Sequence, residues 1–207
     1  MALLDVNKLS IHFGGVKAVQ EVSFSIDAGI VYAVIGPNGA GKTTLFNLIT
    51  GVYKPTSGEI RLDGESIGGK SPNELAVRGV ARTFQNLQIC MNMSAIENVM
   101  VGAHLRLDRN LLKAALRLPT LTRRDAEMRV EAAELMRFVG LEKYIEARAD
   151  SMPYGALKRL EIARALAMKP RLIFLDEPAA GLNPKETIEV DELIRKVADS
   201  GITVVLV

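Results

Sequence analysis

The feature that most constrains this chain is the glycine-rich segment of residues 36–44, GPNGAGKTT, which matches the pattern G-x-x-x-x-G-K-[ST]. An apolar run at residues 30–35 precedes it and predicts a buried strand. The apolar residues 45–49 follow it and predict the first turns of a helix. A strand, a glycine-rich turn and a helix in this order are typical of a loop that holds phosphate groups.

The residue types of this loop suit phosphate binding. Glycines allow successive backbone N–H groups to point into one concave site, and the start of the helix adds partial positive charge. Lys42 supplies a charge for the β- and γ-phosphates, and the hydroxyl of Thr43 is placed to bind Mg²⁺. The sequence therefore predicts a nucleoside triphosphate site made by Gly36, Pro37, Asn38, Gly39, Ala40, Gly41, Lys42, Thr43 and Thr44.

Two carboxylates end a second apolar run. Residues 172–175, LIFL, predict a buried strand of a parallel sheet, and Asp176 and Glu177 follow directly. Ligands of α/β proteins bind at the carboxyl ends of strands, so both acids are expected beside the phosphate loop. Asp176 is then placed to hold Mg²⁺, and Glu177 to orient or deprotonate an attacking water. The alternative, two acids at the surface end of a strand, is weakened by the phosphate loop in the same chain.

Composition limits the classes of protein that remain. The chain has 207 residues, 48% of them apolar, and a formal net charge of +2 without a long basic run, so nucleic acid is not an expected partner. Its single cysteine, Cys90, cannot form an internal disulfide. No stretch approaches the roughly 20 apolar residues that span a bilayer, and the N-terminus lacks a signal-peptide pattern. One domain with a subdomain is expected.

The rest of the chain divides into strand-rich and helical parts. Residues 4–9 and 19–26 alternate in polarity and predict half-buried antiparallel strands. Ser71 and Glu74 form a capping box that predicts a short helix to about residue 78. Strands are expected at residues 59–62 and 80–84 and a last buried strand at 202–207, where Ile202, Val204 and Leu206 are expected to be poorly protected.

Residues 94–149 predict three helices. Ser94 caps the first, and Thr122 is expected to cap the third, which runs to Phe138. The second is predicted by an apolar stripe of Leu111, Leu112, Ala115 and Leu116. Two further helices are expected, one at residues 155–167 and one that begins at Asn183.

Together these motifs resemble, in order and over the whole chain, the nucleotide-binding subunits of ABC transporters. The resemblance implies an α/β fold: a P-loop NTPase (RecA-like) core with an N-terminal antiparallel β subdomain and an inserted α-helical subdomain. Residues 1–86 and 156–207 are assigned to the core and residues 87–155 to the helical subdomain with the signature motif. A single domain spans 1–207, with the C-terminal part of the usual domain expected to be absent.

The resemblance also implies roles for individual residues. Gln85 matches the Q-loop glutamine, which reaches the Mg²⁺ and the attacking water, and Phe13 stands where the family places an aromatic ring against adenine. Tyr154 and Gly155 belong to the signature motif, which covers the γ-phosphate bound to a second subunit. The implied cofactors are ATP and Mg²⁺. Catalysis is assigned to Glu177, Gln85 and Lys42, and the metal to Thr43, Gln85 and Asp176.

Two positions depart from the family pattern. Pro153 replaces the serine of the signature motif, which removes a hydroxyl and an N–H that could face phosphate. The family also has a switch histidine just after the strand that ends here at Val207. Neither His12, in a predicted strand, nor His104, in the helical insert, can take that role.

Within the family the motifs resemble the LivG-like group, which serves branched-chain amino acid import. The expected function is an ATPase subunit that energises an importer of branched-chain or related amino acids. The implied partners are a second ATP-binding subunit, which forms a homo- or heterodimer, integral membrane permease subunits and, indirectly, a periplasmic or surface substrate-binding protein. The expected location is the cytoplasmic face of the inner or plasma membrane.

Residues 84–93 are the predicted docking surface for the membrane partner, through Leu87, Ile89, Met91 and Met93. Two alternatives to transport remain: a soluble ABC ATPase of another process, and a nucleotide-binding module with impaired turnover. A GTPase is disfavoured because no N-K-x-D motif follows the phosphate loop.

Overall fold

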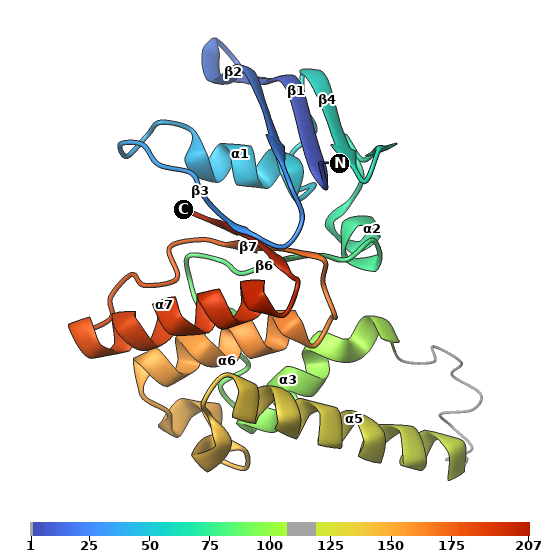
Figure 1. The fold of residues 1–207 in the computed structure, drawn as a ribbon, viewed down its shortest axis with the longest axis vertical. Coiled ribbons are helices and arrows are strands. Elements are labelled where there is room, and N and C mark those ends of the chain that lie inside the picture. The colour runs from blue at the N-terminus through green and yellow to red at the C-terminus, as the bar shows by residue number, and fades with distance from the viewer. Residues whose placement is uncertain (1, 107–118) are drawn as a thin grey trace. The chain divides into compact units, whose positions relative to one another are not determined.

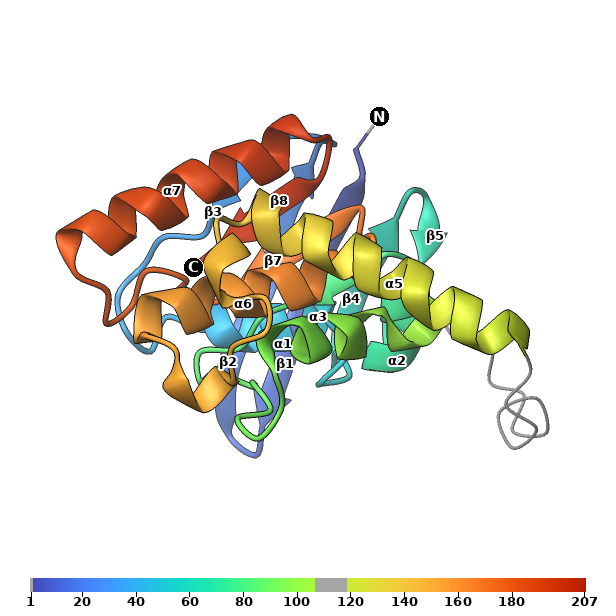
Figure 2. The same ribbon diagram turned by 90° about the horizontal axis from the view of Figure 1, so that it is seen from below.

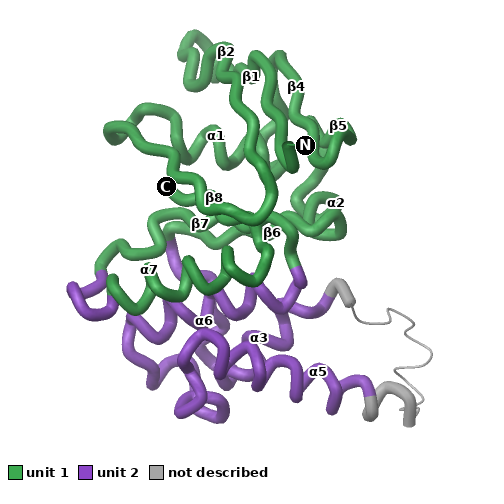
Figure 3. Tube along the Cα trace, viewed as in Figure 1, with its two compact units in different colours: residues 1–85, 170–181, 187–207 green, residues 86–169, 182–186 purple. Residues whose placement is uncertain are grey.

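The computed structural model describes residues 2–106 and 119–207, which form two compact units (Figure 3). Unit 1 comprises residues 1–85, 170–181 and 187–207, and unit 2 comprises residues 86–169 and 182–186. The predicted helical subdomain, residues 87–155, is therefore shorter than unit 2. The apolar stripe predicted at Leu111, Leu112, Ala115 and Leu116 lies outside the described residues.

Unit 1 contains an antiparallel sheet in the strand order β2-β1-β4-β5 (Figure 1). Its strands are β1 (Leu4–Phe13), β2 (Val16–Ile26), β4 (Ser57–Leu62) and β5 (Glu65–Ser66). Leu4 of β1 lies opposite Ile26 on one side and Leu62 on the other. All three side chains are buried, so the alternation in the sequence correctly predicted one face of the sheet packed on the core.

A parallel sheet of unit 1 has the strand order β3-β8-β7-β6. Its strands are β3 (Val31–Ala33), β6 (Val80–Arg82), β7 (Leu172–Leu175) and β8 (Thr203–Leu206). β7 has a neighbour on each side, and all four of its residues are buried. The continuous apolar run of β7 thus folds as the sequence predicts.

The prediction of a buried strand at residues 30–35 is wrong. β3 has only three residues, and the side chains of Ile30 and Ile35 beside it are 47% and 90% exposed. Within the described residues β3 is an edge strand whose paired neighbour is β8. Because β8 lies between β3 and β7, Val204 is fully buried, and the prediction that it would be poorly protected is also wrong.

Helix α1 (Lys42–Ile49) packs between the two sheets of unit 1, as Figure 1 shows. Phe46 of α1 is fully buried and meets Phe174 of β7 edge to face, with ring centroids 4.9 Å apart. The core of unit 1 is built from both sheets and α1; its largest side chains include Leu4, Leu9, Ile26, Phe46, Ile60 and Phe174. α1 is thereby fixed from both sides, which gives the loop before it a rigid support.

Polar caps define the starts of two other helices. α2 (Pro72–Val77) begins at Ser71, which forms the predicted capping box with Glu74. The backbone amide and the hydroxyl of Ser71 lower the pKa of the Glu74 carboxyl from its ordinary value. α7 (Pro184–Asp199) begins at Asn183, whose side chain accepts a hydrogen bond from the Glu186 amide at 3.0 Å. Both helix starts are as the sequence predicts.

Unit 2 is helical, and its elements are drawn in Figure 2. Helix α3 packs against both α5 and α6. Among the described residues, the helices that lie wholly in unit 2 are α3 (Ala95–Gly102), η1 (Ala103–Arg106), α5 (Pro119–Phe138), η2 (Glu142–Tyr144), η3 (Ala149–Ser151) and α6 (Tyr154–Leu166).

Glycine permits a close helix crossing in unit 2. A Cβ on Gly102 of α3 would lie 2.0 Å from the carbonyl oxygen of Arg164 in α6, so only glycine fits there. The prediction that Thr122 caps the third helix is wrong, because α5 is already helical at Pro119. Across the described residues, no helix combines the length and the apolar character needed to cross a membrane.

Candidate nucleotide-binding site

The glycine-rich loop connects β3 to α1, which is the arrangement that the sequence predicts. Residues 36–40 are exposed, so their backbone groups can reach a ligand. Gly41 is the N-cap of α1 and has a φ of +87°. A Cβ at this position would lie 2.5 Å from the carbonyl oxygen of Ala18. Gly41 is therefore required both by its backbone conformation and by the close approach of β2.

Lys42 folds back over the loop. Its Nζ donates hydrogen bonds to the carbonyl oxygens of Gly36 at 2.8 Å and Pro37 at 3.0 Å. These contacts hold the ammonium group over the first residues of the loop, next to the N-terminus of α1. A charge and a helix N-terminus at one place favour an anionic ligand.

A cavity of about 410 Å³ lies at the loop. Its walls come from the loop and the start of α1, from the beginning of β2, and from the segments that follow β6 and β7. The lining residues are Val16, Lys17, Ala18, Asn38, Gly39, Gly41, Lys42, Thr43, Thr44, Gln85 and Glu177. The structure thus brings Lys42, Thr43, Gln85 and Glu177, which the sequence predicts as site residues, to one cavity.

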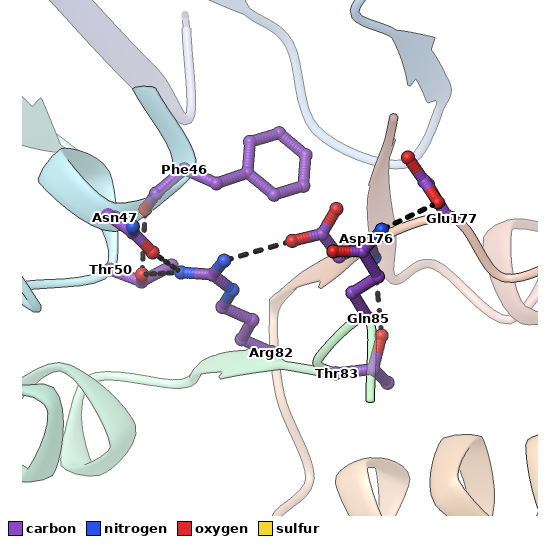
Figure 4. A network of polar contacts seen from close by, with 8 residues as sticks. All are labelled: Phe46, Asn47, Thr50, Arg82, Thr83, Gln85, Asp176 and Glu177. Atoms are coloured by element: carbon purple, nitrogen blue, oxygen red, sulfur yellow. Dashed lines mark hydrogen bonds and ion pairs between the residues drawn. The ribbon is translucent and has the colours of Figure 1, made fainter. Parts of the chain in front are cut away.

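The two carboxylates after β7 have different environments, drawn in Figure 4. Asp176 is 3% exposed, and its Oδ2 accepts a hydrogen bond from Arg82 at 3.0 Å. Glu177 lines the cavity, and its Oε2 accepts a hydrogen bond from Nε2 of Gln85 at 3.1 Å. Asp176 is not among the cavity-lining residues.

The backbone at Glu177 is unusual. Its φ is +48°, in the left-handed region that residues other than glycine rarely adopt. The Glu177 amide donates to the carbonyl oxygen of Val207 at 3.2 Å, and the Glu177 carbonyl accepts from Ala180. Such strain is found where the surrounding structure fixes a residue, and it is common at functional sites.

Phe13 does not line the cavity, although Val16, opposite it in the β1–β2 pair, does. The ring of Phe13 is 45% exposed and meets Tyr53 edge to face, with centroids 5.2 Å apart. Phe13, which the sequence predicts as the adenine contact, therefore belongs to an exposed aromatic pair. Tyr53 follows α1, and nothing in the sequence pattern marked it.

The signature residues lie at the start of α6 in unit 2. Pro153 is the N-cap and provides no side-chain hydrogen bond to the helix. Tyr154 is 45% exposed, whereas Gly155 is buried. The carboxylate of Glu186 packs against Gly155, since a Cβ there would lie 2.5 Å from Glu186 Oε1.

The predicted docking segment is only partly exposed. Met91 is 41% exposed, but Ile89 is buried, so the prediction that Ile89 belongs to a docking surface is wrong. The buried Asn98 explains the shape of this segment: its side chain accepts from the amide of Cys90 at 2.8 Å and donates to the Cys90 carbonyl at 3.0 Å. The turn that carries Met91 is thus tied to α3.

Sequence reasoning missed two further residues of the site. Lys17 lines the cavity from β2 and adds a second positive charge to it. Arg82 has a side chain only 7% exposed and pairs with Asp176. A charged residue inside the apolar strand pattern of residues 80–84 was the available signal for Arg82, because such a group must find a partner when it is buried.

Comparison with known proteins places these features in a family. A family model described as "ABC transporter" matches residues 19–180. The chain is 44% identical over 206 residues to the high-affinity branched-chain amino acid transport ATP-binding protein BraF of Pseudomonas aeruginosa, covering 99% of this chain and 81% of that protein. It is 42% identical to the corresponding Escherichia coli protein LivG, covering 99% of this chain and 80% of LivG.

A solved structure supports the same assignment. The crystal structure of a nucleotide-free ATP-binding cassette from an ABC transporter has a TM-score of 0.86 and 32% identity, covering all of this chain and 81% of that one. The predicted fold class, a P-loop NTPase core with antiparallel β and helical parts, is confirmed. The chain belongs to the ABC transporter family, whose ATP-binding subunits are ATPases.

Proposed function

We propose that this chain is the ATP-hydrolysing subunit of an importer for branched-chain or related amino acids. The observation that carries the substrate class is the 44% identity to BraF over nearly the whole chain. The observation that supports ATP hydrolysis is the single cavity shared by the phosphate loop, Gln85 and Glu177.

Nucleotide binding is assigned to the exposed side of the cavity. The backbone N–H groups of residues 38–44 and the Lys42 ammonium hold the phosphates, and the Phe13 ring contacts adenine. The Lys42 ammonium already lies against the loop through the Gly36 and Pro37 carbonyls, which supports its assignment to the phosphates.

Mg²⁺ is assigned to Thr43, Gln85 and Asp176. The donor set fits this ion, because a hydroxyl, an amide oxygen and a carboxylate are hard oxygen ligands and ATP supplies further oxygens. When bound, the ion would neutralise part of the charge on the β- and γ-phosphates. Asp176 is buried, and its Oδ2 pairs with Arg82 at 3.0 Å.

Hydrolysis is assigned to Glu177 and Gln85. Glu177 accepts the proton of the attacking water, and the contact with the Gln85 amide holds the carboxylate in one orientation. The strained backbone at Glu177 serves the same purpose, since it fixes where the side chain leaves the end of β7.

The partners are assigned by family membership. A second ATP-binding subunit presents its Tyr154 and Gly155 to the γ-phosphate, membrane permease subunits hold the chain at the cytoplasmic face of the membrane, and a substrate-binding protein delivers the amino acid. Residues 84–93 are proposed to meet the permease through Leu87, Met91 and Met93 rather than the buried Ile89.

Uptake in the native host tests the substrate class. Deleting the gene should abolish uptake of radiolabelled leucine, isoleucine or valine while ribose uptake is unchanged. Expression of the wild-type chain should restore amino acid uptake, and expression of Lys42→Ala at the same level should not. If leucine uptake survives deletion and another solute is lost, the amino acid assignment is wrong, although the ATPase assignment is not.

A further inference from the structure

Arg82 is the centre of a buried polar network in unit 1 that the proposed mechanism does not use (Figure 4). One arm of its guanidinium, Nη1, donates to Oδ1 of Asn47 at 2.6 Å and to Oγ1 of Thr50 at 3.0 Å. The other arm, Nη2, donates to Oδ2 of Asp176 at 3.0 Å. The planar fork of arginine therefore bridges α1 and the end of β7.

The two bridged elements and the segment of Arg82 itself carry the three proposed Mg²⁺ ligands. Asn47 lies on α1, the helix that begins with Lys42 and Thr43, and Thr50 is the C-cap of that helix. Asp176 is itself a proposed ligand. Arg82 is three residues before Gln85, and its guanidinium lies 5.1 Å from the ring centroid of the intervening Phe84. One side chain thus contacts each element that has to converge on the ion.

The network is held on both sides of the Arg82–Asp176 pair. The amide of Thr83 donates to the carbonyl of Phe174 at 2.9 Å, and the amide of Asp176 donates back to Oγ1 of Thr83 at 3.3 Å. The guanidinium also lies 5.8 Å from the ring centroid of the buried Phe46. These contacts hold the backbone at Asp176, and the hydrogen bond from Arg82 holds its carboxylate.

Arg82 is also an expensive residue to place here. Its Nε is buried and has no hydrogen-bond partner among the described residues. Burying a guanidinium with an unpaired N–H carries a desolvation cost, and the hydrogen bonds of the other two nitrogens to Asp176, Asn47 and Thr50 offset it. The arginine therefore contributes these hydrogen bonds besides packing.

We propose that Arg82 is a positioning residue that fixes the Asp176 carboxylate relative to Thr43 and so sets the geometry of the Mg²⁺ site. This inference rests on the proposed metal role of Asp176. A point charge beside Asp176 does not suffice, because the bridge to Asn47 and Thr50 requires the second arm of the fork. Residues that orient a metal ligand in this way typically change metal affinity by about 10- to 100-fold.

The test measures how much Mg²⁺ strengthens ATP binding. Calorimetric titration gives the Kd for ATP in EDTA and in excess Mg²⁺. The Kd in EDTA divided by the Kd in Mg²⁺, called the Mg²⁺ ratio below, reports the metal site rather than the phosphate loop. Arg82→Met should lower this ratio about tenfold, equivalent to about 1.4 kcal/mol, while the Kd in EDTA stays within about twofold. Asp176→Asn should lower the ratio at least as much.

Arg82→Lys separates positioning from charge. A lysine keeps a positive charge beside Asp176 but cannot bond the carboxylate and the α1 side chains at once. We therefore expect the melting temperature of Arg82→Lys to return from that of Arg82→Met toward the wild-type value, while its Mg²⁺ ratio stays as low as that of Arg82→Met. Recovery of both would mean that Arg82 acts only as a counter-ion, and the proposal would be overturned.

Two further variants keep the test decisive. If Arg82→Met does not fold, Asn47→Ala removes one anchor of the fork without unpairing Asp176, and it should lower the ratio severalfold by the same loss of orientation. Arg171→Met is the matched control: it breaks the exposed pair of Arg171 with Asp63 in the same unit and should leave the ratio unchanged.

The outcomes distinguish the two levels of the proposal. An unchanged ratio in Arg82→Met or in Asn47→Ala, together with a lowered ratio in Asp176→Asn, removes Arg82 from the metal site. An unchanged ratio in Asp176→Asn removes Asp176 instead, and the proposed metal ligands with it.

Discussion

Two apolar runs lead into the nucleotide site, and they differ in structure more than in sequence. Residues 172–175 form β7, which is buried along its whole length between two neighbours. Residues 30–35 include only the short edge strand β3, and Ile35 is 90% exposed. Hydrophobicity alone did not separate them, because the number of neighbouring strands decides burial and local sequence does not report it.

The difference extends to the groups that follow each strand. After β3 the loop is exposed; Lys42 contacts the carbonyls of Gly36 and Pro37, and the Ala40 amide donates to the Pro37 carbonyl at 3.2 Å. After β7 the carboxylates are held by Arg82, Gln85 and backbone hydrogen bonds. The loop proposed to bind phosphate, residues 36–44, can adapt to its ligand, whereas the side chains proposed to carry out hydrolysis, Gln85 and Glu177, are fixed in advance, as electrostatic catalysis requires.

The largest effect should come from the side chains proposed to carry out hydrolysis, Glu177 and Gln85. Glu177→Gln keeps the shape of the side chain and removes the base, so steady-state phosphate release should fall about 1,000-fold while the ATP Kd changes less than about threefold. ATP should then favour a two-subunit species in size-exclusion chromatography. Exposed Glu65→Gln is the control and should hydrolyse ATP normally. A monomeric Glu177→Gln that still turns over would take Glu177 out of the mechanism.

The next prediction compares the same substitution in the two runs. Ile173→Ala in β7 removes a fully buried side chain and should lower the free energy of unfolding by about 3 kcal/mol. Ile35→Ala should change it by no more than about 0.5 kcal/mol, because the side chain is already in water. Urea denaturation measures both. Equal losses would show that residues 30–35 are covered in solution.

The sequence predicted the parts of the fold that depend on local chemistry. The capping residues Ser71, Ser94 and Asn183 and the loop before α1 lie where the patterns placed them. Gly41 could be identified because a glycine-rich loop has to bring backbone close to a ligand, and the structure adds a second reason in its approach to Ala18.

What the sequence could not predict depends on tertiary neighbours. The sequence predicts Ile89 as an apolar surface residue of the docking segment. In the structure Ile89 is buried, and the Asn98 side chain accepts a hydrogen bond from the adjacent Cys90 amide. The pairing of Arg82 with Asp176 joins residues 94 positions apart. No single-sequence pattern reports which buried acid a buried arginine meets, so the most informative contact of the site appeared only in the structure.

A third prediction concerns Lys42 and the loop that is proposed to bind phosphate, residues 36–44. Lys42→Ala removes the ammonium group from the loop and should weaken ATP binding about 100-fold, because hydrogen bonds to charged groups contribute about 1.5–3 kcal/mol. Calorimetry with Mg²⁺–ATP measures the loss, and Lys54→Ala, which changes an exposed lysine outside the cavity, serves as the control. Affinity within twofold of wild type would show that the loop does not bind the triphosphate.

The smallest effect should come from the exposed aromatic pair of Phe13 and Tyr53, which lies outside the cavity lining. Phe13→Ala should weaken ATP binding about tenfold, since stacking of a base on an aromatic side chain is worth about 1–3 kcal/mol. Tyr53→Ala should cost about threefold, because an edge-to-face pair contributes about 0.5–1.5 kcal/mol and here acts only by holding the Phe13 ring. Tyr53→Phe keeps the ring and should behave as wild type.

Inorganic tripolyphosphate distinguishes this role from a general loss of structure. It carries the charges of ATP without the base, so neither Phe13→Ala nor Tyr53→Ala should change its affinity, whereas Lys42→Ala should weaken it as much as it weakens ATP. If both aromatic variants weaken tripolyphosphate and ATP alike, the pair supports the β1–β2 hairpin beside the loop and does not contact adenine. Adenine would then have to meet another part of the chain.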